Sequence, residues 1–292
     1  MLLAVLGAVA FSGKAIIVKL AYRYGVDAVT LIMLRMLFAL PFFLAMSWWA
    51  SRPSGARVPV ALTRPDVAGI VGLGLTGYYL ASFLDFAGLA FITASLERLI
   101  LYLNPTLVLL LGWVLLGKRI ARRQALGMAI SYGGVLLVFG HEARLDGSGT
   151  ALGALLVFLS AVSYAVYLFY SGEMVQRLGS MRLVGLATSV ACVFCIAQFV
   201  VLRPWSVLQT VAPEVVWLSV LNATLCTVVP VMLVMMAIER IGSGLAAQVG
   251  MVGPMSTMLM GVLLLGEPFT AWLLAGTALV IAGVAVCSRT SA

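Results

Sequence analysis

Long apolar runs, separated by short polar or glycine- and proline-containing segments, dominate the chain. A membrane-spanning helix needs about 20 mostly apolar residues, and the runs have about that length, which is more than a strand of a membrane barrel requires. Because only helices and closed barrels satisfy every backbone group in lipid, the pattern predicts an all-α membrane protein with ten transmembrane helices. The predicted spans cover residues 2–22, 30–50, 67–87, 93–116, 124–140, 151–171, 182–202, 215–237, 245–265 and 270–288.

The composition supports this class. Of the 292 residues, 63% are hydrophobic and 10% are charged, with a mean hydropathy of +1.14. A soluble domain has about 45–50% apolar and about 25% charged residues, so soluble, disordered and fibrous proteins are excluded. The longest polar segment, Ser51–Asp66, is predicted as a loop rather than a domain. A signal peptide requires positive residues before its apolar stretch. None precedes the first run here, so Leu2–Tyr22 is predicted as the first span.

The basic residues are distributed unequally between the two sides of the predicted bundle. Of the 18 Lys and Arg residues, eleven fall in loops or ends on the side of the N-terminus and three in loops on the other side. Cytoplasmic loops carry the excess of Lys and Arg, so both termini are predicted to be cytoplasmic, in the cell (inner) membrane. We call this predicted cytoplasmic side the inner side. The net charge of +8 therefore indicates orientation rather than nucleic-acid binding.

The chain repeats itself with a shift of 149 residues, which predicts two halves of five spans each, over residues 1–140 and 151–288. Five is an odd number, so the second half enters the membrane from the opposite face, as in the inverted repeats of secondary transporters. Small residues four apart in spans 5 and 10, Ala129 with Gly133 and Ala278 with Ala282, predict a closely packed scaffold. The matched positions are Pro105 and Pro254, Gly112 and Gly261, Gly117 and Gly266, Gly127 and Gly276, and Gly134 and Gly283.

Ionisable residues inside spans are costly and often functional. Lys14 lies about 12 Å from the outer end of its span, at 1.5 Å per residue, so we expect it to face a substrate, with a structural role as the alternative. The other five lie near the outer ends of their spans and could snorkel to the surface. The hypothesis we favour is an outer gate in which the two acids pair with Arg98, Arg35 or Lys19. These five residues are Lys19, Arg35, Asp85, Glu97 and Arg98.

Prolines and polar side chains at mid-depth predict a central cavity. Pro105 and Pro254 interrupt matching spans of the two halves, which is the best sequence pointer to a transporter's binding site; simple packing kinks are the alternative. We predict that the cavity binds substrate through Lys14 and polar residues of several spans. The polar candidates are Tyr78, Tyr79, Ser82, Tyr102, Asn104, Ser163, Tyr164, Tyr167, Asn222, Thr224 and Gln248.

Signals of cofactor, metal or catalytic chemistry are weak. The GxGxxG pattern of Gly72–Gly77 lies inside an apolar span, where helix packing by small residues explains it better than a dinucleotide site does. The one histidine, His141, falls in a predicted outer loop without a metal-binding cluster, and the four cysteines fall in or beside apolar runs, which argues against a disulfide framework. We therefore expect no cofactor, no metal and no enzymatic activity.

Short motifs over nearly the whole chain resemble the drug/metabolite transporter superfamily, in its EamA-type branch of ten-helix exporters. The segment FSGKAIIVKL of Phe11–Leu20 places Lys19 at the family's lysine position, and Arg35 in LRMLFA resembles the arginine of the second span. Pro105 with LLLGWVLLGK and Pro254 with MGVLLLGEP are similar to the signatures of helices 4 and 9. The resemblance implies cytoplasmic termini, an inverted five-plus-five fold and a cavity formed mainly by helices 1, 3, 4, 6, 8 and 9.

The chain departs from this family pattern at three positions. Phe11 replaces the usual tryptophan, Lys14 replaces an uncharged residue, and Lys118 stands where the first repeat often has the acid that Glu267 keeps in the second. Lys14 therefore distinguishes the predicted cavity from that of its relatives.

The sequence thus favours a secondary transporter or facilitator that exports small metabolites by alternating access, with amino acids, including aromatic and neutral ones, as the expected substrates. Exporters of drugs, nucleotide precursors or sugar phosphates remain alternatives, as do an intramembrane lipid-modifying enzyme and a structural subunit. The expected partners are a small-molecule substrate and the lipid bilayer, without nucleic acid. The chain is expected to be a monomer or a homodimer.

Overall fold

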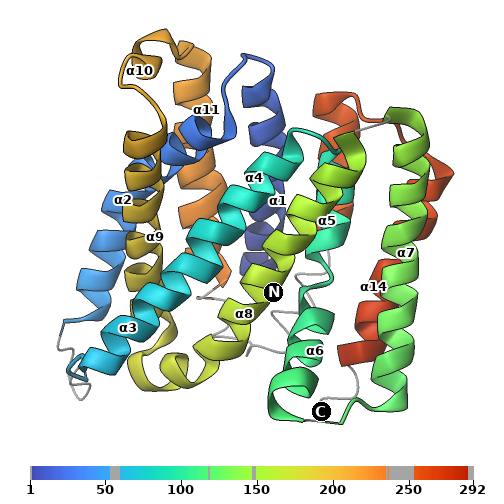
Figure 1. Cartoon of the computed structure of the whole chain (residues 1–292), viewed down its shortest axis with the longest axis horizontal. Coiled ribbons are helices and arrows are strands. Elements are labelled where there is room, and N and C mark those ends of the chain that lie inside the picture. Colours follow the sequence, from blue (N-terminus) through green and yellow to red (C-terminus); the bar gives the residue numbers. More distant parts are fainter. Residues whose placement is uncertain are drawn as a thin grey trace.

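The computed structural model describes residues 2–52, 60–117, 119–146, 149–234, 236 and 253–288. This part of the chain is helical and contains no strand. Eight of its helices are long and apolar enough to cross a membrane, and two shorter apolar helices, Gly253–Leu265 and Ala271–Cys287, correspond to the ninth and tenth predicted spans. The all-α, multi-pass membrane fold predicted from the apolar runs is confirmed (Figure 1).

The first five predicted spans match the helices of the first half. The third and fourth spans are divided into shorter elements, whereas the other three are continuous α-helices. In chain order, the elements are α1 (Leu2–Tyr22), α2 (Ala28–Ala50), α3 (Arg64–Leu73), the π-helix η1 (Gly74–Leu80), α4 (Ala81–Leu89), α5 (Ala94–Leu101), α6 (Asn104–Leu116) and α7 (Arg122–Asp146).

The second half follows the same plan. Residues 245–252 of the ninth predicted span lie outside the described residues, so its helix begins here at Gly253. In chain order, the elements are α8 (Thr150–Leu178), α9 (Ser180–Leu202), the short α10 (Val207–Thr210), α11 (Pro213–Ala223), the π-helix η3 (Thr224–Val228), α13 (Gly253–Met260), the π-helix η4 (Gly261–Leu265) and α14 (Ala271–Ser288).

The wide π-turns of the third and eighth spans occupy equivalent positions. A shift of 149 residues places η3, Thr224–Val228, within η1, Gly74–Leu80. Two further equivalent residues, Gly117 and Gly266, end α6 and η4 in the left-handed conformation, with φ of 63° and 72°, which favours glycine because a side chain would be strained there. The repeat is therefore visible in local backbone conformation as well as in sequence.

Pro105 divides the fourth span instead of merely bending it. Helix α5 ends at Leu101, and α6 begins at Asn104, so that Pro105 lies in the first turn of the new helix. Proline fits there because its missing N–H has no intrahelical partner to lose. Pro254 is the second residue of α13, but the residues before that helix lie outside the described part, so a matching break there stays a prediction.

Helices α7 and α14 pack backbone against backbone and lie side by side in Figure 1. A Cβ atom added to Gly127 would lie 2.6 Å from the carbonyl oxygen of Gly283, and one added to Gly134 would lie 2.7 Å from that of Gly276. The scaffold role predicted for spans 5 and 10 agrees with this contact, but the small residues predicted to form it do not. Gly133 has open space around it, because it faces away from α14.

Helices of the two halves interleave around the centre of the bundle. Helix α1 packs against α11, η3 and α13 of the second half, and α8 packs against α4, η1, α5 and α6 of the first. Each half therefore contributes its first helix to the other half, and the side chains between them define a cavity.

Candidate substrate cavity

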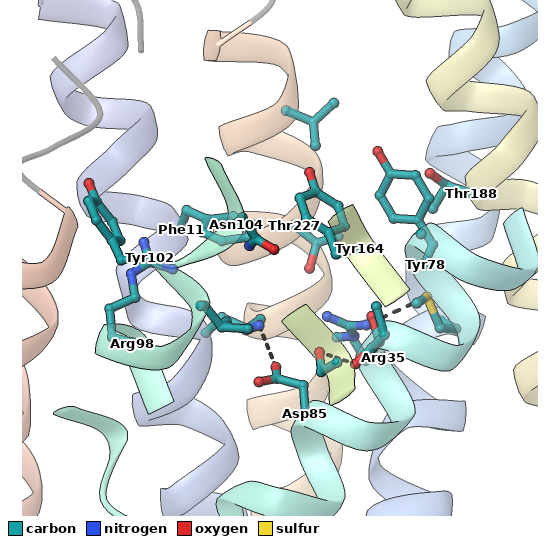
Figure 2. A pocket seen from close by; sticks show the side chains of 18 residues that line it. Phe11, Arg35, Tyr78, Asp85, Arg98, Tyr102, Asn104, Tyr164, Thr188 and Thr227 are labelled. Carbon is teal, nitrogen blue, oxygen red and sulfur yellow. Dashed lines mark hydrogen bonds and ion pairs between the residues drawn. The ribbon is translucent and has the colours of Figure 1, made fainter. Parts of the chain in front are cut away.

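A cavity of about 310 Å³ lies between the two halves. Ligand pockets in proteins are commonly about 300–1,000 Å³, so this one suits a small metabolite. In the view of Figure 2, Arg98 and Tyr102 lie on one side, Tyr78 and Thr188 on the other, and Asp85 at one end. The lining residues are Phe11, Lys14, Arg35, Met36, Gly77, Tyr78, Ala81, Ser82, Asp85, Arg98, Leu101, Tyr102, Asn104, Ser160, Tyr164, Thr188, Thr227 and Val231.

Half of the residues predicted to bind substrate line this cavity. Six of them line it, namely Lys14, Tyr78, Ser82, Tyr102, Asn104 and Tyr164. Three residues that we predicted as parts of a gate, Arg35, Asp85 and Arg98, also line it. Their role in binding substrate stays a prediction.

Six of the twelve predicted binding residues are not in the lining, Tyr167 and Thr224 among them. Tyr79 packs instead against Phe194, with ring centroids 5.6 Å apart. The Ser163 hydroxyl donates to the carbonyl oxygen of Thr76 at 2.7 Å and so ties α8 to η1. Asn222 is fully buried, and Gln248 lies outside the described residues.

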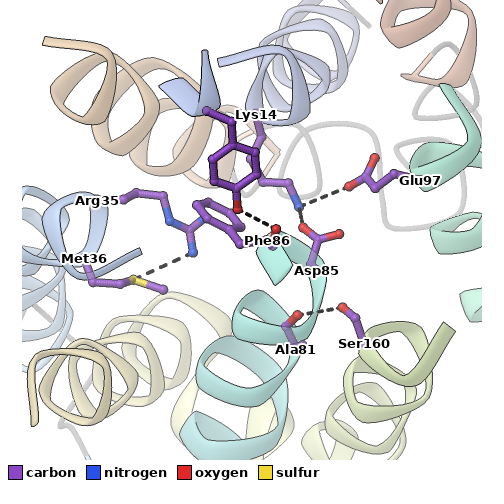
Figure 3. A network of polar contacts seen from close by, with 9 residues as sticks. Lys14, Arg35, Met36, Ala81, Asp85, Phe86, Glu97 and Ser160 are labelled. Atoms are coloured by element: carbon purple, nitrogen blue, oxygen red, sulfur yellow. Dashed lines mark hydrogen bonds and ion pairs between the residues drawn. The ribbon is translucent and has the colours of Figure 1, made fainter. Parts of the chain in front are cut away.

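Lys14 is the centre of a buried ion-pair cluster. Its Nζ atom lies 2.5 Å from Oδ2 of Asp85 and 3.6 Å from Oε1 of Glu97 (Figure 3). Asp85 and Glu97 are 1% and 0% exposed, so neither carboxylate snorkels to the surface. Charges this deeply buried need a partner, and the lysine supplies one to both acids.

This cluster corrects the pairing that we predicted for the outer gate. We expected Asp85 and Glu97 to pair with Arg98, Arg35 or Lys19, but the ion pairs found in the described residues are with Lys14. The reason is the reach of the lysine side chain, whose flexible four-carbon stem carries its ammonium group from the middle of α1 to α4 and α5. The depth of Lys14 along its helix did not by itself reveal these two partners.

Both arginines that line the cavity pack against phenylalanine rings. The Arg35 guanidinium carbon lies 4.6 Å from the ring centroid of Phe86, and that of Arg98 lies 5.0 Å from Phe11, distances at which a cation is attracted to the ring face. Arg98 also donates a hydrogen bond of 3.3 Å to the Ser12 hydroxyl. The Nε atoms of both arginines are buried and lack a hydrogen-bond partner among the described residues.

Tyrosine rings form the wall of the cavity that lies opposite Arg98 (Figure 2). The hydroxyl groups of Tyr78 and Tyr167 lie 3.3 Å apart, and the rings of Tyr164 and Tyr167 stack with centroids 5.3 Å apart. Gly77 permits this packing, because a side chain there would collide with the Tyr167 ring. The wall offers both aromatic surface and hydroxyl groups.

Sequence reasoning missed several lining residues of ordinary type. Thr188 and Thr227 are single hydroxyl residues within apolar spans, and Ser160 donates to the carbonyl oxygen of Ala81 at 2.7 Å. Met36 also lines the cavity from α2. Such residues occur throughout membrane helices, so their types carried no signal; Phe11 was noted only as a departure from the family's tryptophan.

Beyond Lys14, the C-terminal end of α1 is hydrogen-bonded to neighbouring segments on the predicted outer side. Lys19 Nζ donates to the carbonyl oxygens of Leu89 and Ile92 at 3.2 and 2.8 Å. The Tyr22 hydroxyl donates to the carbonyl oxygen of Phe86 at 2.5 Å. These contacts close the bundle between the cavity and that end of α1.

A carboxylate of the second half caps a helix of the first. Glu267 accepts hydrogen bonds from the backbone N–H groups of Ala94 and Ser95, at 2.7 and 3.3 Å, and from the Ser95 hydroxyl at 2.7 Å. An anion at the N-terminal end of α5 also interacts favourably with the helix dipole. Arg23 adds a hydrogen bond of 2.9 Å to the carbonyl oxygen of Leu265, so the last residue of η4 joins the same closure.

Apolar helices enclosing a cavity with buried charges of both signs define a class, the multi-pass membrane transporter. The sequence profile of the EamA-like transporter family matches residues 1–140 and again residues 151–289. The chain therefore belongs to the EamA-like transporter family, within the drug/metabolite transporter superfamily.

Similar proteins agree with this assignment. The uncharacterized transporter YcbK of Bacillus subtilis (strain 168) is 29% identical over 268 residues, covering 90% of this chain and 84% of that protein. The uncharacterized transporter YvbV of the same organism is 26% identical over 207 residues, covering 70% of this chain and 66% of that protein. A known crystal structure with 19% sequence identity covers 99% of this chain and 96% of its own, with a TM-score of 0.64, which shows a shared fold.

Proposed function

We propose that this transporter exports amino acids, aromatic and neutral ones included, through the cavity between its two halves. The observation that carries the proposal is the presence of Asp85 and two buried arginines, Arg35 and Arg98, in one small cavity. A zwitterion presents an ammonium and a carboxylate group a short distance apart. The cavity offers a partner for each.

The chemistry of the lining suggests how such a substrate would bind. Asp85 would accept hydrogen bonds from the substrate ammonium group, and Arg98 or Arg35 would donate to its carboxylate, since charge-assisted hydrogen bonds are the stronger ones. The side chain of the substrate would then lie against Tyr78 and Tyr164. Offset and edge-to-face packing of aromatic rings favours an aromatic or apolar side chain there.

Export requires that the cavity be reached from each side in turn. The contacts of Lys19, Tyr22 and Glu267 close the predicted outer side in this conformation, while the cavity extends along α1 from Lys14 towards Phe11, on the inner side. We propose that breaking the outer contacts, with the two halves rocking against each other, exposes the cavity to the outside.

Purified protein in liposomes provides the test. Counterflow of labelled L-phenylalanine, followed by a panel of other labelled amino acids, is expected with the wild type and is expected to fall strongly with Arg98→Ala. Glu173→Gln, which changes an exposed carboxylate of α8, is the matched control and should retain counterflow.

Competition separates the alternatives. Unlabelled sugar phosphates, nucleosides and cationic drugs should inhibit less than unlabelled amino acids do, because none of them combines an ammonium and a carboxylate group. Counterflow of a sugar phosphate in the absence of any amino-acid counterflow would replace the proposed substrate class, and hydrolysis or transfer on a lipid substrate would replace transport with enzymatic activity.

A further inference from the structure

Two buried carboxylates share one ammonium group beside the cavity. Lys14 lies within ion-pair distance of both Asp85 and Glu97, and the three side chains together carry one more acid than base. Two nearby carboxylates in a buried site do not both ionise readily, because burial and mutual repulsion favour one bound proton. Asp85, with the shorter contact to Lys14, is the better placed of the two to keep its charge.

Glu97 is the better placed to hold the proton. Both of its carboxylate oxygens are buried and accept no hydrogen bond among the described residues, whereas Asp85 has one such oxygen, Oδ1, and its other oxygen receives the short contact from Lys14. An ionised carboxylate without hydrogen bonds is costly to bury. Glu97 also lies behind Asp85, outside the cavity lining, so a substrate reaches Asp85 before Glu97.

The surroundings of the cluster are mostly cationic or neutral. Arg98 follows Glu97 on α5, but it is directed towards Ser12 and Phe11, and Arg35 rests on Phe86. The titratable and charged groups that face the cluster in the described part of the chain are Tyr22 of α1, Arg35 of α2, Arg98 of α5 and Cys226 of η3. None of them adds a further carboxylate that could take the proton instead.

We propose that Lys14, Asp85 and Glu97 form a proton-coupling cluster that exchanges one proton for the ammonium group of the substrate. This inference rests on the proposed function, and it makes the transporter a substrate–proton antiporter. Before substrate binds, Lys14 pairs with ionised Asp85 and Glu97 carries a proton. When a substrate ammonium group takes the place of Lys14 at Asp85, the lysine shifts to Glu97, which releases its proton.

The net charge of the cluster together with the bound ammonium group is conserved in this exchange, and the carboxylate of the substrate is neutralised separately by Arg98 or Arg35. The ammonium group that enters brings one positive charge, and the proton that leaves Glu97 removes one. The two observed distances, 2.5 Å from Lys14 Nζ to Asp85 and 3.6 Å to Glu97, place the lysine where a small movement changes its partner. The lysine thus couples substrate binding at Asp85 to proton release at Glu97, although the substrate itself does not contact both residues.

Liposomes that contain the wild-type protein separate this inference from the proposed function. Counterflow of labelled L-phenylalanine at equal pH tests transport alone. An acid interior, with the membrane potential clamped, should then drive accumulation of phenylalanine inside, up to about tenfold per pH unit for one-to-one exchange, and a protonophore should abolish the accumulation. Counterflow without gradient-driven accumulation overturns the inference and leaves the proposed function standing, whereas absence of counterflow with every amino acid refutes both.

A variant and a binding measurement assign the proton to Glu97. Glu97→Gln should lose gradient-driven accumulation, while the control Glu173→Gln retains it; accumulation by Glu97→Gln equal to that of the wild type would show that Glu97 does not carry the proton. If Glu97→Gln fails to fold, the wild type in detergent still gives an answer. Addition of L-phenylalanine in a weakly buffered solution should release about one proton per protein molecule by this stoichiometry, and binding without proton release overturns the inference.

Discussion

The ammonium group of Lys14 on α1 and the carboxylate of Asp85 on α4 meet at 2.5 Å inside the bundle, where both side chains are almost wholly buried. The pair joins the first helix to the third predicted span at the edge of the cavity. Its burial makes the pairing important, because a buried charge without a partner is costly.

Removal of Lys14 and Asp85 together should therefore cost less than the two separate removals added together. Lys14→Ala is expected to lower the free energy of unfolding by about 3–5 kcal/mol, the usual cost of leaving a buried charge unpaired. Asp85→Asn should cost less, because Glu97 lies 3.6 Å from Lys14 and remains as its partner. The double variant should lose clearly less than the sum of the two. Thermal unfolding in detergent, with the four proteins compared in a double-mutant cycle, measures the coupling; additive losses would show that the two side chains do not stabilise each other.

The crossing of α7 and α14 should tolerate no side chain at its closest points. Gly127→Ala is expected to destabilise the protein by about 1–3 kcal/mol, as overpacking does, because the new methyl group would lie 2.6 Å from the Gly283 carbonyl oxygen. Gly133→Ala is the matched control, since Gly133 lies on the same helix with nothing near it. Its free energy of unfolding should stay within about 0.5 kcal/mol of that of the wild type, and equal losses in both variants would contradict the observed packing.

The N-terminus of α2 gives the protein a pH-dependent contribution to stability. Asp27 caps this helix and lies 3.2 Å from the guanidinium group of Arg203. Partial burial would by itself raise the pKa of the Asp27 carboxyl, but hydrogen bonds from Thr30 and the nearby charge of Arg203 outweigh it and lower the pKa below its ordinary value. A lowered pKa stabilises the folded state above the unfolded pKa of about 3.9, and this stabilisation is lost as the pH falls through the folded pKa.

Asp27→Asn tests this contribution, because asparagine also caps helices well but carries no charge. At neutral pH the variant should be less stable by under about 1 kcal/mol, which is usual for a partly exposed ion pair. The difference should shrink as the pH falls below about 4, where the wild-type carboxyl gains its proton. A difference in melting temperature that stays constant across the acid range would argue against the charge as its cause.

Glu267 should hold the predicted outer side closed. Glu267→Ala removes the hydrogen bonds to Ala94 and Ser95, and bonds to a charged group contribute about 1.5–3 kcal/mol each. A cysteine placed at Ile92, which is 2% exposed, should then react with a membrane-impermeant thiol reagent at least about fivefold faster. Glu214→Ala, at the exposed start of α11, is the control, and unchanged labelling in Glu267→Ala would show that the cap does not restrain opening.

The positions of the helices could be predicted from sequence because lipid demands a long apolar run for each span. The repeat was equally legible, since Gly117 and Gly266 serve the same local purpose at the ends of α6 and η4. The π-turns could not be predicted, because an apolar run has the same residue pattern whether its turns are wide or regular. They became visible only in the backbone of the structure.

The cavity could be predicted only in part. Tyr78 and Tyr79 are equally plausible from depth along the span, yet successive residues of a helix point in different directions, and Tyr79 lies against Phe194 instead. The partner of Lys14 depended on how helices from different parts of the sequence pack, which the spacing of charges along each helix does not encode. Thr188 and Thr227 carried no signal, because hydroxyl residues are common in membrane helices that have no site.

Ser131 and Val280 form a contact that the rocking motion proposed above would leave undisturbed. The Ser131 hydroxyl lies 3.5 Å from the carbonyl oxygen of Val280, midway between the two glycine contacts of α7 and α14, and the shift of 149 residues that relates the halves turns one of these two residues into the other. In the proposed exchange of conformations between the two halves, this contact is therefore carried onto itself. The pair would lie where that motion displaces atoms least, so the same contact would serve whichever side is open.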